Sequence, residues 1–192
     1  MTETISALLA SFSLIGLAEI GDKSQIVCMT LAARHRAWPV LFGAITAFLL
    51  LNTLAVLFGA AVAAWLPESL VAGSVALLFA AFGVQSLLSS GDEHPEDVTD
   101  KPGRSVFLTA FLLIFLAEFG DKTQIAVAGL AGNLAPLPVW VGASMALIAI
   151  SALGVWVGRT LLQRIPAAWL HRLGGVIFLA FALAAGWRAL TV

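Results

Sequence analysis

Two short runs of charged and polar residues stand inside apolar stretches of this chain, and their side chains are the ones best suited to chemistry. One run is Glu19–Gln25 (EIGDKSQ) and the other is Glu118–Gln124 (EFGDKTQ). An ionisable side chain near the middle of a membrane helix costs about 2.5–3.5 kcal/mol on insertion scales, so such residues usually serve a function. The two runs therefore predict a single site assembled from both.

The charge of these runs favours a divalent cation as ligand. Together they hold four carboxylates and two ammonium groups, a formal charge of −2, on Glu19, Asp22, Glu118, Asp121, Lys23 and Lys122. Carboxylate, amide, hydroxyl and carbonyl oxygens are hard ligands that suit Mg²⁺, Ca²⁺ or Mn²⁺, whereas Zn²⁺ or Cu⁺ would call for His or Cys. Removing the ion leaves excess negative charge in a low dielectric, which favours proton uptake. Competition between metal and protons for the same acids is a direct route to metal/proton exchange.

The other polar residues of the runs are candidates for further contacts with the ion or its path, namely Gln25, Gln124, Ser24, Thr123, Lys23 and Lys122. On a continuous helix, Glu19, Asp22 and Lys23 share roughly one face. Gly21 and Gly120 permit close helix contact or a local unwinding that would free backbone carbonyls. A lysine beside the ion either tethers a carboxylate or swings away when metal enters, and the sequence leaves both roles open.

A purely structural role is the alternative, in which each acid–lysine pair is a buried salt bridge between helices. Two copies of the run and an excess of acids over bases disfavour it.

The composition predicts an integral membrane protein. Of the 192 residues, 60% are hydrophobic and 11% charged, with a mean hydropathy of +1.00, whereas soluble domains carry about 25% charged residues. Nothing in the charge balance supports a nucleic-acid partner. The one cysteine, Cys28, excludes an internal disulfide.

Six apolar stretches are long enough to span a membrane as helices, which need about 20 residues. They are Ile5–Ala33, Pro39–Trp65, Glu68–Leu88, Ser105–Ala131, Pro138–Leu162 and Ala168–Leu190. The alternating segments of about ten residues that a barrel requires are absent. The polar residues inside these stretches are predicted to form hydrogen bonds between helices, namely Asn52, Thr46, Thr53, Gln85, Ser144 and Ser151.

An internal repeat relates the two halves with a constant offset of 99, since Glu19 falls on Glu118 and Asp22 on Asp121. The chain then divides into a three-helix repeat (residues 1–90), an acidic linker (91–104) and a second three-helix repeat (105–192). Because each repeat has an odd number of spans, the second repeat enters the membrane from the side opposite to the first. We therefore predict an all-α integral membrane protein with six transmembrane helices in two inverted three-helix repeats, as in many secondary transporters.

Basic residues outside the two runs predict the orientation, because Lys and Arg accumulate on the cytoplasmic side. There are eight such residues, namely Arg34, Arg36, Lys101, Arg104, Arg159, Arg164, Arg172 and Arg188. If both termini lie outside, the first seven fall at cytoplasmic connections and only Arg188 lies on the far side. This places the acidic linker in the cytoplasm. We expect no cleavable signal peptide, because the first four residues carry an acid rather than basic residues and the apolar stretch after them is of spanning length.

The doubled pattern E-x-G-D-[KR]-[ST], at Glu19–Ser24 and Glu118–Thr123, resembles that of small membrane cation/proton antiporters, which include Golgi and chloroplast manganese/calcium transporters and bacterial manganese exporters. The resemblance covers the whole chain. It implies that Glu19, Asp22, Glu118 and Asp121 bind the ion, and that Mn²⁺ or Ca²⁺ moves against protons with no permanently bound cofactor. Similarity to the prokaryotic members implies Mn²⁺ efflux across a bacterial inner membrane.

Several alternatives remain open at this stage. A Ca²⁺/H⁺ antiporter would use the same site. A passive cation channel or a non-transporting membrane assembly subunit belongs to a different class. An intramembrane hydrolase is disfavoured, because no Ser/His, Asp/Asp or His-Glu-x-x-His constellation is present. Small-residue faces such as Gly59–Ala61 would permit a homodimer.

Overall fold

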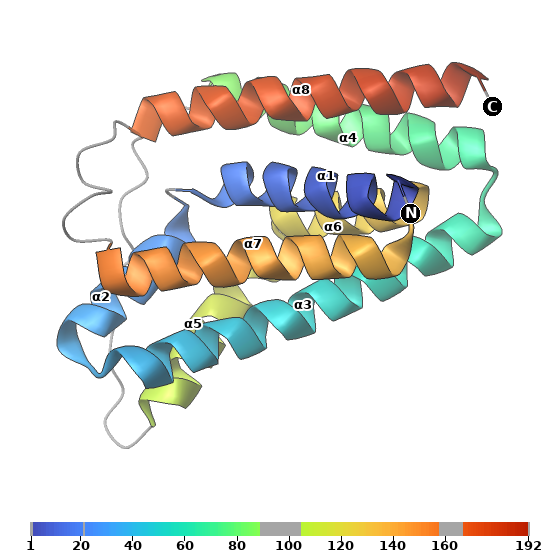
Figure 1. Cartoon of the computed structure of the whole chain (residues 1–192). Helices are drawn as coiled ribbons and strands as arrows, with labels where there is room; N and C mark the ends of the chain where they lie inside the picture. The colour runs from blue at the N-terminus through green and yellow to red at the C-terminus, as the bar shows by residue number, and fades with distance from the viewer. Residues whose placement is uncertain (1, 21, 89–104, 158–166, 192) are drawn as a thin grey trace.

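The computed structural model describes residues 2–20, 22–88, 105–157 and 167–191, and its regular structure there is entirely helical (Figure 1). The helices are α1 (Thr2–Glu19), α2 (Lys23–Arg34), α3 (Ala37–Trp65), α4 (Glu68–Leu88), α5 (Val106–Glu118), α6 (Lys122–Asn133), α7 (Pro136–Val157) and α8 (Ala167–Thr191). The all-α prediction is confirmed. The predicted acidic linker at 91–104 lies outside the described residues.

The first and fourth predicted spans are broken rather than continuous. Helix α1 ends at Glu19, and α2 leaves it at an angle of 67°. Helix α5 ends at Glu118 and α6 begins at Lys122. The prediction that Glu19 and Asp22 share one face of a continuous helix is therefore wrong, because both runs lie where helices end and begin.

Glycine permits the second break. Gly120 has a φ of +77°, in the left-handed region that costs other residues about 1–2 kcal/mol. Its amide donates a hydrogen bond of 2.6 Å to Oε1 of Gln124, so a backbone donor released at the end of α5 finds a partner. The local unwinding anticipated from the glycine is present here.

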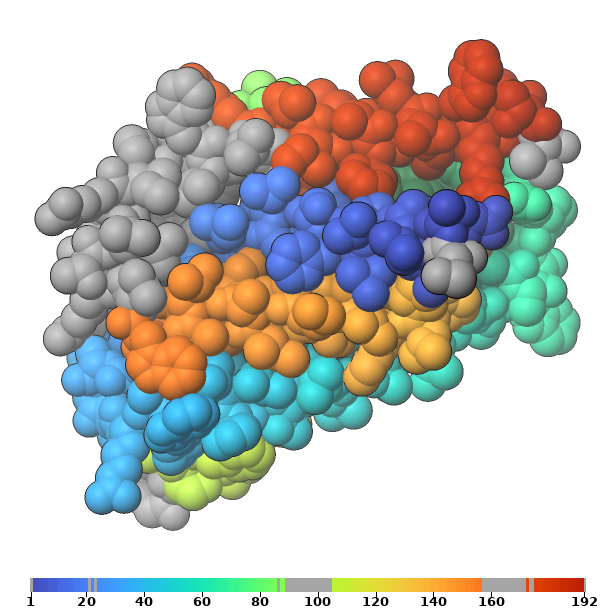
Figure 2. Space-filling model, in the orientation of Figure 1, coloured from blue at the N-terminus to red at the C-terminus, as the bar shows by residue number. Residues whose placement is uncertain are grey.

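Apolar length distinguishes the helices. Among the described residues, three helices are long and apolar enough to cross a membrane, namely α3, α4 and α7, and the bent pair α1–α2 makes a fourth if it counts as one span. Helix α5 and the segment Gly175–Thr191 of α8 are apolar but shorter. Large apolar side chains such as Trp65, Leu183 and Leu190 are exposed, which suits a surface that faces lipid. In the space-filling view, α8 runs along one edge of the molecule, with α1 and then α7 below it (Figure 2).

Close helix contacts occur in equivalent pairs. A Cβ added to Gly43 of α3 would lie 2.5 Å from the carbonyl oxygen of Phe107 on α5, and one added to Gly142 of α7 would lie 2.3 Å from that of Leu8 on α1. Gly142 lies 99 residues after Gly43, and Phe107 lies 99 residues after Leu8, so the two contacts involve equivalent positions of the repeat. The sequence repeat therefore corresponds to a repeated packing contact, with α3 against α5 and α7 against α1.

Helices α4 and α8 pack along each other and form one face of the bundle (Figure 1). The buried rings of Phe79 and Phe178, also 99 residues apart, meet edge to face with centroids 5.8 Å apart. Residues Leu14, Ile15 and Ile114 join them in the main core. The N-terminal end of α1 and the C-terminal end of α8 lie at the same end of the molecule.

Candidate metal centre

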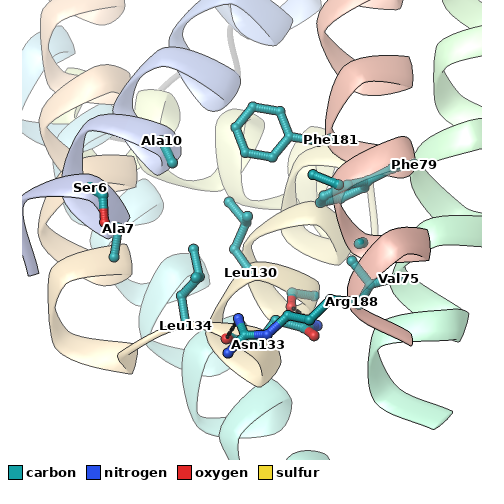
Figure 3. A pocket seen from close by; sticks show the side chains of 13 residues that line it. Ser6, Ala7, Ala10, Val75, Phe79, Leu130, Asn133, Leu134, Phe181 and Arg188 are labelled. Atoms are coloured by element: carbon teal, nitrogen blue, oxygen red, sulfur yellow. Dashed lines mark hydrogen bonds between the residues drawn. The ribbon is translucent and has the colours of Figure 1, made fainter. Parts of the chain in front are cut away.

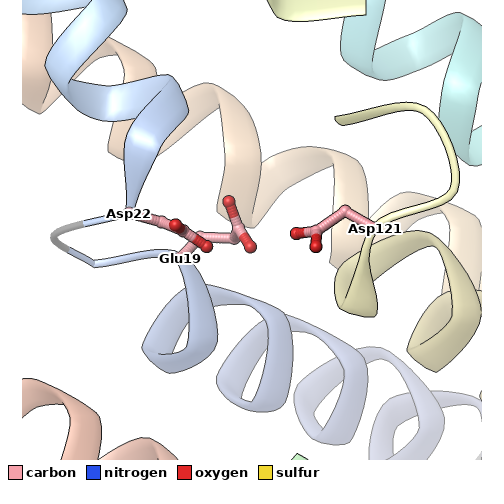
Figure 4. A group of neighbouring side chains, drawn as sticks. All are labelled: Glu19, Asp22 and Asp121. Atoms are coloured by element: carbon pink, nitrogen blue, oxygen red, sulfur yellow. The ribbon is translucent and has the colours of Figure 1, made fainter. Parts of the chain in front are cut away.

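The helix breaks bring carboxylates from both halves together (Figure 4). Glu19 is the last residue of α1, Asp22 precedes α2, and Asp121 precedes α6. One carboxylate oxygen from each lies within 4.8 Å of those of the other two. Oxygens on opposite sides of a bound Mg²⁺ or Ca²⁺ stand about 4–5 Å apart, so three oxygens at this spacing are placed to share one ion.

These carboxylates are withdrawn from solvent. Glu19 is fully buried, Asp22 is 6% exposed and Asp121 is partly buried. Burying several like charges is costly unless cations or protons balance them. The arrangement therefore favours the binding of positive charge.

Glu118, the fourth predicted ligand, is buried at the end of α5. Its carboxylate interacts electrostatically with Asp22 and Asp121 but is not among the three whose oxygens lie within 4.8 Å of one another. The structure thus places three predicted ligands in one cluster and the fourth beside it.

Hydroxyl groups hold Glu19 from both halves of the chain. Thr123 donates a hydrogen bond to its Oε1, across the interface between the two runs. Ser24 donates to its Oε2 at 3.4 Å. Both hydroxyl residues are buried. Each carboxylate oxygen has two lone pairs, so these bonds orient Glu19 without using up its capacity to bind a cation.

Lys122 also crosses between the halves. Its Nζ lies 2.5 Å from Oδ2 of Asp22, in a pair whose side chains are 28% and 8% exposed. The lysine of the second run is therefore paired with an acid of the first. The side chain of Lys23 lies outside the described part of the chain.

The two glutamines of the runs differ in their surroundings. Gln124 accepts the hydrogen bond from the Gly120 amide and so stabilises the break between α5 and α6. Gln25 is buried on α2, where its Cγ would lie 3.1 Å from a Cβ added to Gly154 of α7. Gln25 thus packs at the contact between α2 and α7.

A buried polar contact joins the two long central helices, where Nδ2 of Asn52 on α3 donates to Oγ of Ser144 on α7 at 3.1 Å. This confirms the predicted interhelical role of these two residues, whereas Thr46 donates to the carbonyl oxygen of Phe42 in its own helix. Because polar residues inside apolar helices have several possible partners, the sequence alone did not pair these two.

A separate cavity of about 210 Å³ opens among α1, α4, α6 and α8 (Figure 3). Its lining is mostly apolar, with Phe79, Leu130 and Phe181 among the contributors. The cation in its wall, Arg188, donates to the carbonyl oxygen of Asn133 at 2.9 Å. Apolar walls and a guanidinium group do not suit a divalent cation, so among the described residues the acidic cluster remains the candidate for a metal site.

Comparison with known proteins identifies the family. The family model described as "Divalent cation/proton antiporter GDT1" matches residues 7–94 and 106–192. The chain is 32% identical over 201 residues to GDT1-like protein 3 of Oryza sativa, covering 92% of this chain and 72% of the relative. It is 29% identical over 187 residues to a protein of Vibrio cholerae named putative manganese exporter, covering 95% of this chain and 92% of the relative.

No solved structure matches the chain. The two-part family match falls on the two halves that carry the acidic runs, and the all-helical structure with several candidate spans is that of a multi-pass membrane protein. This is a family of transporters rather than of enzymes, and divalent cations and protons are its transported substrates. The chain belongs to the GDT1 family of divalent cation/proton antiporters.

Proposed function

We propose that this protein exports Mn²⁺ from the cytoplasm in exchange for protons, and that Glu19, Asp22 and Asp121 bind the ion with Glu118 beside them. The observation that carries the proposal is the convergence of three carboxylate oxygens within 4.8 Å at two helix breaks. Irregular backbone inside a membrane protein is tolerated where it lines a cavity, and broken helices form the ion sites of many transporters.

The choice of ion follows from the ligands and from one relative. Carboxylate and hydroxyl oxygens favour hard divalent cations over Zn²⁺ or Cu⁺. The similarity to a protein named putative manganese exporter supports Mn²⁺ and the outward direction. The same oxygen set suits Ca²⁺, so Ca²⁺/H⁺ exchange is the alternative.

Proton coupling follows from the electrostatics of the cluster. When the metal leaves, the carboxylates of Glu19, Asp22 and Glu118 repel one another, and proton binding relieves that repulsion. Metal and protons therefore exclude each other from one site, which is the requirement for exchange.

The six-span architecture is part of the proposal. Each pair α1–α2 and α5–α6 forms one broken span, and α3, α4, α7 and α8 form the others, in two inverted repeats at residues 1–90 and 105–192. The equivalent contacts at Gly43 and Gly142 support this arrangement. The halves rock about the acidic cluster, with both termini on the extracytoplasmic side of a bacterial inner membrane and the linker 91–104 in the cytoplasm.

Reconstitution into proteoliposomes tests the function. With a proton gradient imposed, Mn²⁺ flux should depend on the gradient, and a pH-sensitive dye should report protons moving the opposite way. Flux that ignores the gradient would refute antiport and favour a passive channel. No flux of either Mn²⁺ or Ca²⁺ would refute transport altogether.

Matched variants test the site. Asp121→Asn removes one carboxylate of the cluster and should abolish Mn²⁺ flux. Glu68→Gln is the control, because Glu68 is an exposed acid on α4 that pairs with Arg188, and its flux should equal that of the wild type. Equal flux from a correctly folded Asp121→Asn protein would overturn the assignment.

A further inference from the structure

Lys122 occupies an unexpected position for a basic residue. It is the first residue of α6, where the positive end of the helix dipole disfavours a cation. The electrostatic compensation comes from the acids around it, since Nζ contacts Asp22 at 2.5 Å and the ammonium is also attracted to Glu19 and Asp121. These three acids are the ones whose oxygens lie within 4.8 Å of one another.

The ammonium and a divalent ion would therefore draw on the same three carboxylates. An ion bridging Glu19, Asp22 and Asp121 would stand next to Nζ, and two cations so close in a poorly solvated site repel each other strongly. The two cannot both be accommodated with Lys122 where it now lies. The lysine stem is flexible and its side chain is 28% exposed, so it has a route away from the cluster.

We propose that Lys122 is a tethered competitor of the transported ion: its ammonium neutralises Asp22 while the site holds no metal, and divalent binding must displace it. The inference rests on the proposed function, because it concerns the same site. Competition from the lysine weakens metal binding and thereby promotes release of the ion on the far side.

Neutral substitutions give the first test, with Mn²⁺ binding to the purified full-length protein measured by calorimetry. Lys122→Met and Lys122→Gln should lower the Kd for Mn²⁺ by about tenfold or more, in line with couplings measured for close charge pairs. Lys122→Arg keeps the positive charge and should not lower the Kd. Arg188→Gln is the matched control, because it removes a cation that pairs with Glu68 outside the cluster, and it should leave the Kd unchanged.

Transport separates competition from a merely structural role. In proteoliposomes, Lys122→Met should lower both the KM for Mn²⁺ and the maximal rate, since tighter binding slows release. If Lys122 only holds Asp22 in place, its removal should raise both the Kd and the KM. A raised or unchanged Kd in both neutral variants would overturn the proposal.

A measurement on the unsubstituted protein guards against variants that do not fold. Labelling of Lys122 by an amine-reactive reagent, quantified by mass spectrometry, should increase when Mn²⁺ is added, because displacement exposes the ammonium. Unchanged or decreased labelling would contradict displacement. If the wild-type protein neither binds nor exchanges Mn²⁺, the proposed function fails; if it does both and only the Lys122 results go the other way, the present inference alone fails.

Discussion

Replacing Gly120 with alanine separates backbone conformation from side-chain packing at the acidic cluster. Gly120 has a φ of +77°, and a Cβ added there would meet no atom within 4 Å. Steric crowding is therefore excluded, and the cost is that of placing an L-residue in the left-handed region, about 1–2 kcal/mol. We expect Gly120→Ala to lower the free energy of unfolding by that amount.

The same substitution at Gly16 is the control. Gly16 lies inside α1, and a Cβ there would contact Cβ of Ala146 at an ordinary 3.7 Å. Alanine in a helix interior is favoured over glycine by about 0.5–1 kcal/mol. The two alanine variants should therefore differ by about 1.5–3 kcal/mol in unfolding free energy, with opposite signs relative to the wild type.

The backbone change at Gly120 should also reach the proposed ion site. If alanine relaxes toward helical dihedrals, α5 and α6 join, the hydrogen bond from the Gly120 amide to Gln124 is lost, and Asp121 moves away from Glu19 and Asp22. We expect Mn²⁺ binding to weaken from the wild type to Gly120→Asn and further to Gly120→Ala, because Asn tolerates the left-handed region better than alanine.

Denaturant titration of the reconstituted protein measures stability, and calorimetry measures the Kd for Mn²⁺. If Gly120→Ala matches the wild type in both, the break does not depend on the glycine and the reasoning is refuted. If Gly16→Ala is destabilised as much as Gly120→Ala, the loss is a general effect of added volume rather than of φ.

Three further predictions concern contacts around and away from the cluster. Thr123→Val keeps the side-chain volume but removes the hydrogen bond to Glu19. Because hydrogen bonds to charged groups contribute about 1.5–3 kcal/mol, the Kd for Mn²⁺ should rise about tenfold or more, whereas Thr123→Ser should keep the Kd near that of the wild type. Equal affinities of the two variants would show that the hydroxyl does not orient Glu19. Gly142→Ala places a Cβ 2.3 Å from the carbonyl oxygen of Leu8, whereas the Cβ of Gly73→Ala meets only Cβ of Ala189 at 3.9 Å. Overpacking should lower the unfolding free energy of the Gly142→Ala protein by about 1–3 kcal/mol in chemical denaturation. Similar stability of both variants would contradict the close approach of α7 to α1. Arg188→Gln removes a largely exposed ion pair with Glu68 at 3.4 Å and the exposed hydrogen bond to the carbonyl oxygen of Asn133. The unfolding free energy should therefore change by less than about 2 kcal/mol, and proteoliposome flux should stay the same. A loss of flux would mean that this end of the bundle takes part in transport.

The sequence predicted the helices well where apolar length alone decides them. Helices α3, α4 and α7 begin within two residues of the predicted spans Pro39–Trp65, Glu68–Leu88 and Pro138–Leu162. It failed at the two acidic runs, because helical periodicity continues across them and hides the breaks. Gly120 was the available signal, yet a glycine is equally compatible with close helix packing, so only the backbone resolved the choice in favour of unwinding.

The residues of the acidic cluster could be named from the sequence, but the geometry of the cluster could not. Residue types predicted a hard-cation chemistry for Glu19, Asp22 and Asp121, and the offset of 99 linked the two runs. Neither fact indicates that Thr123 bonds to Glu19 or that Lys122 pairs with Asp22. Such contacts depend on how two segments about a hundred residues apart approach each other.

By itself, the sequence determined that this is an apolar helical chain with two copies of one acidic run, because composition and spacing are local properties. The tertiary structure decided which acids meet, which lysine lies among them and where the helices break. The physical reason is that a charge cluster in a poorly solvated interior is defined by distances of a few ångströms, which only the packing of α1, α2, α5 and α6 sets.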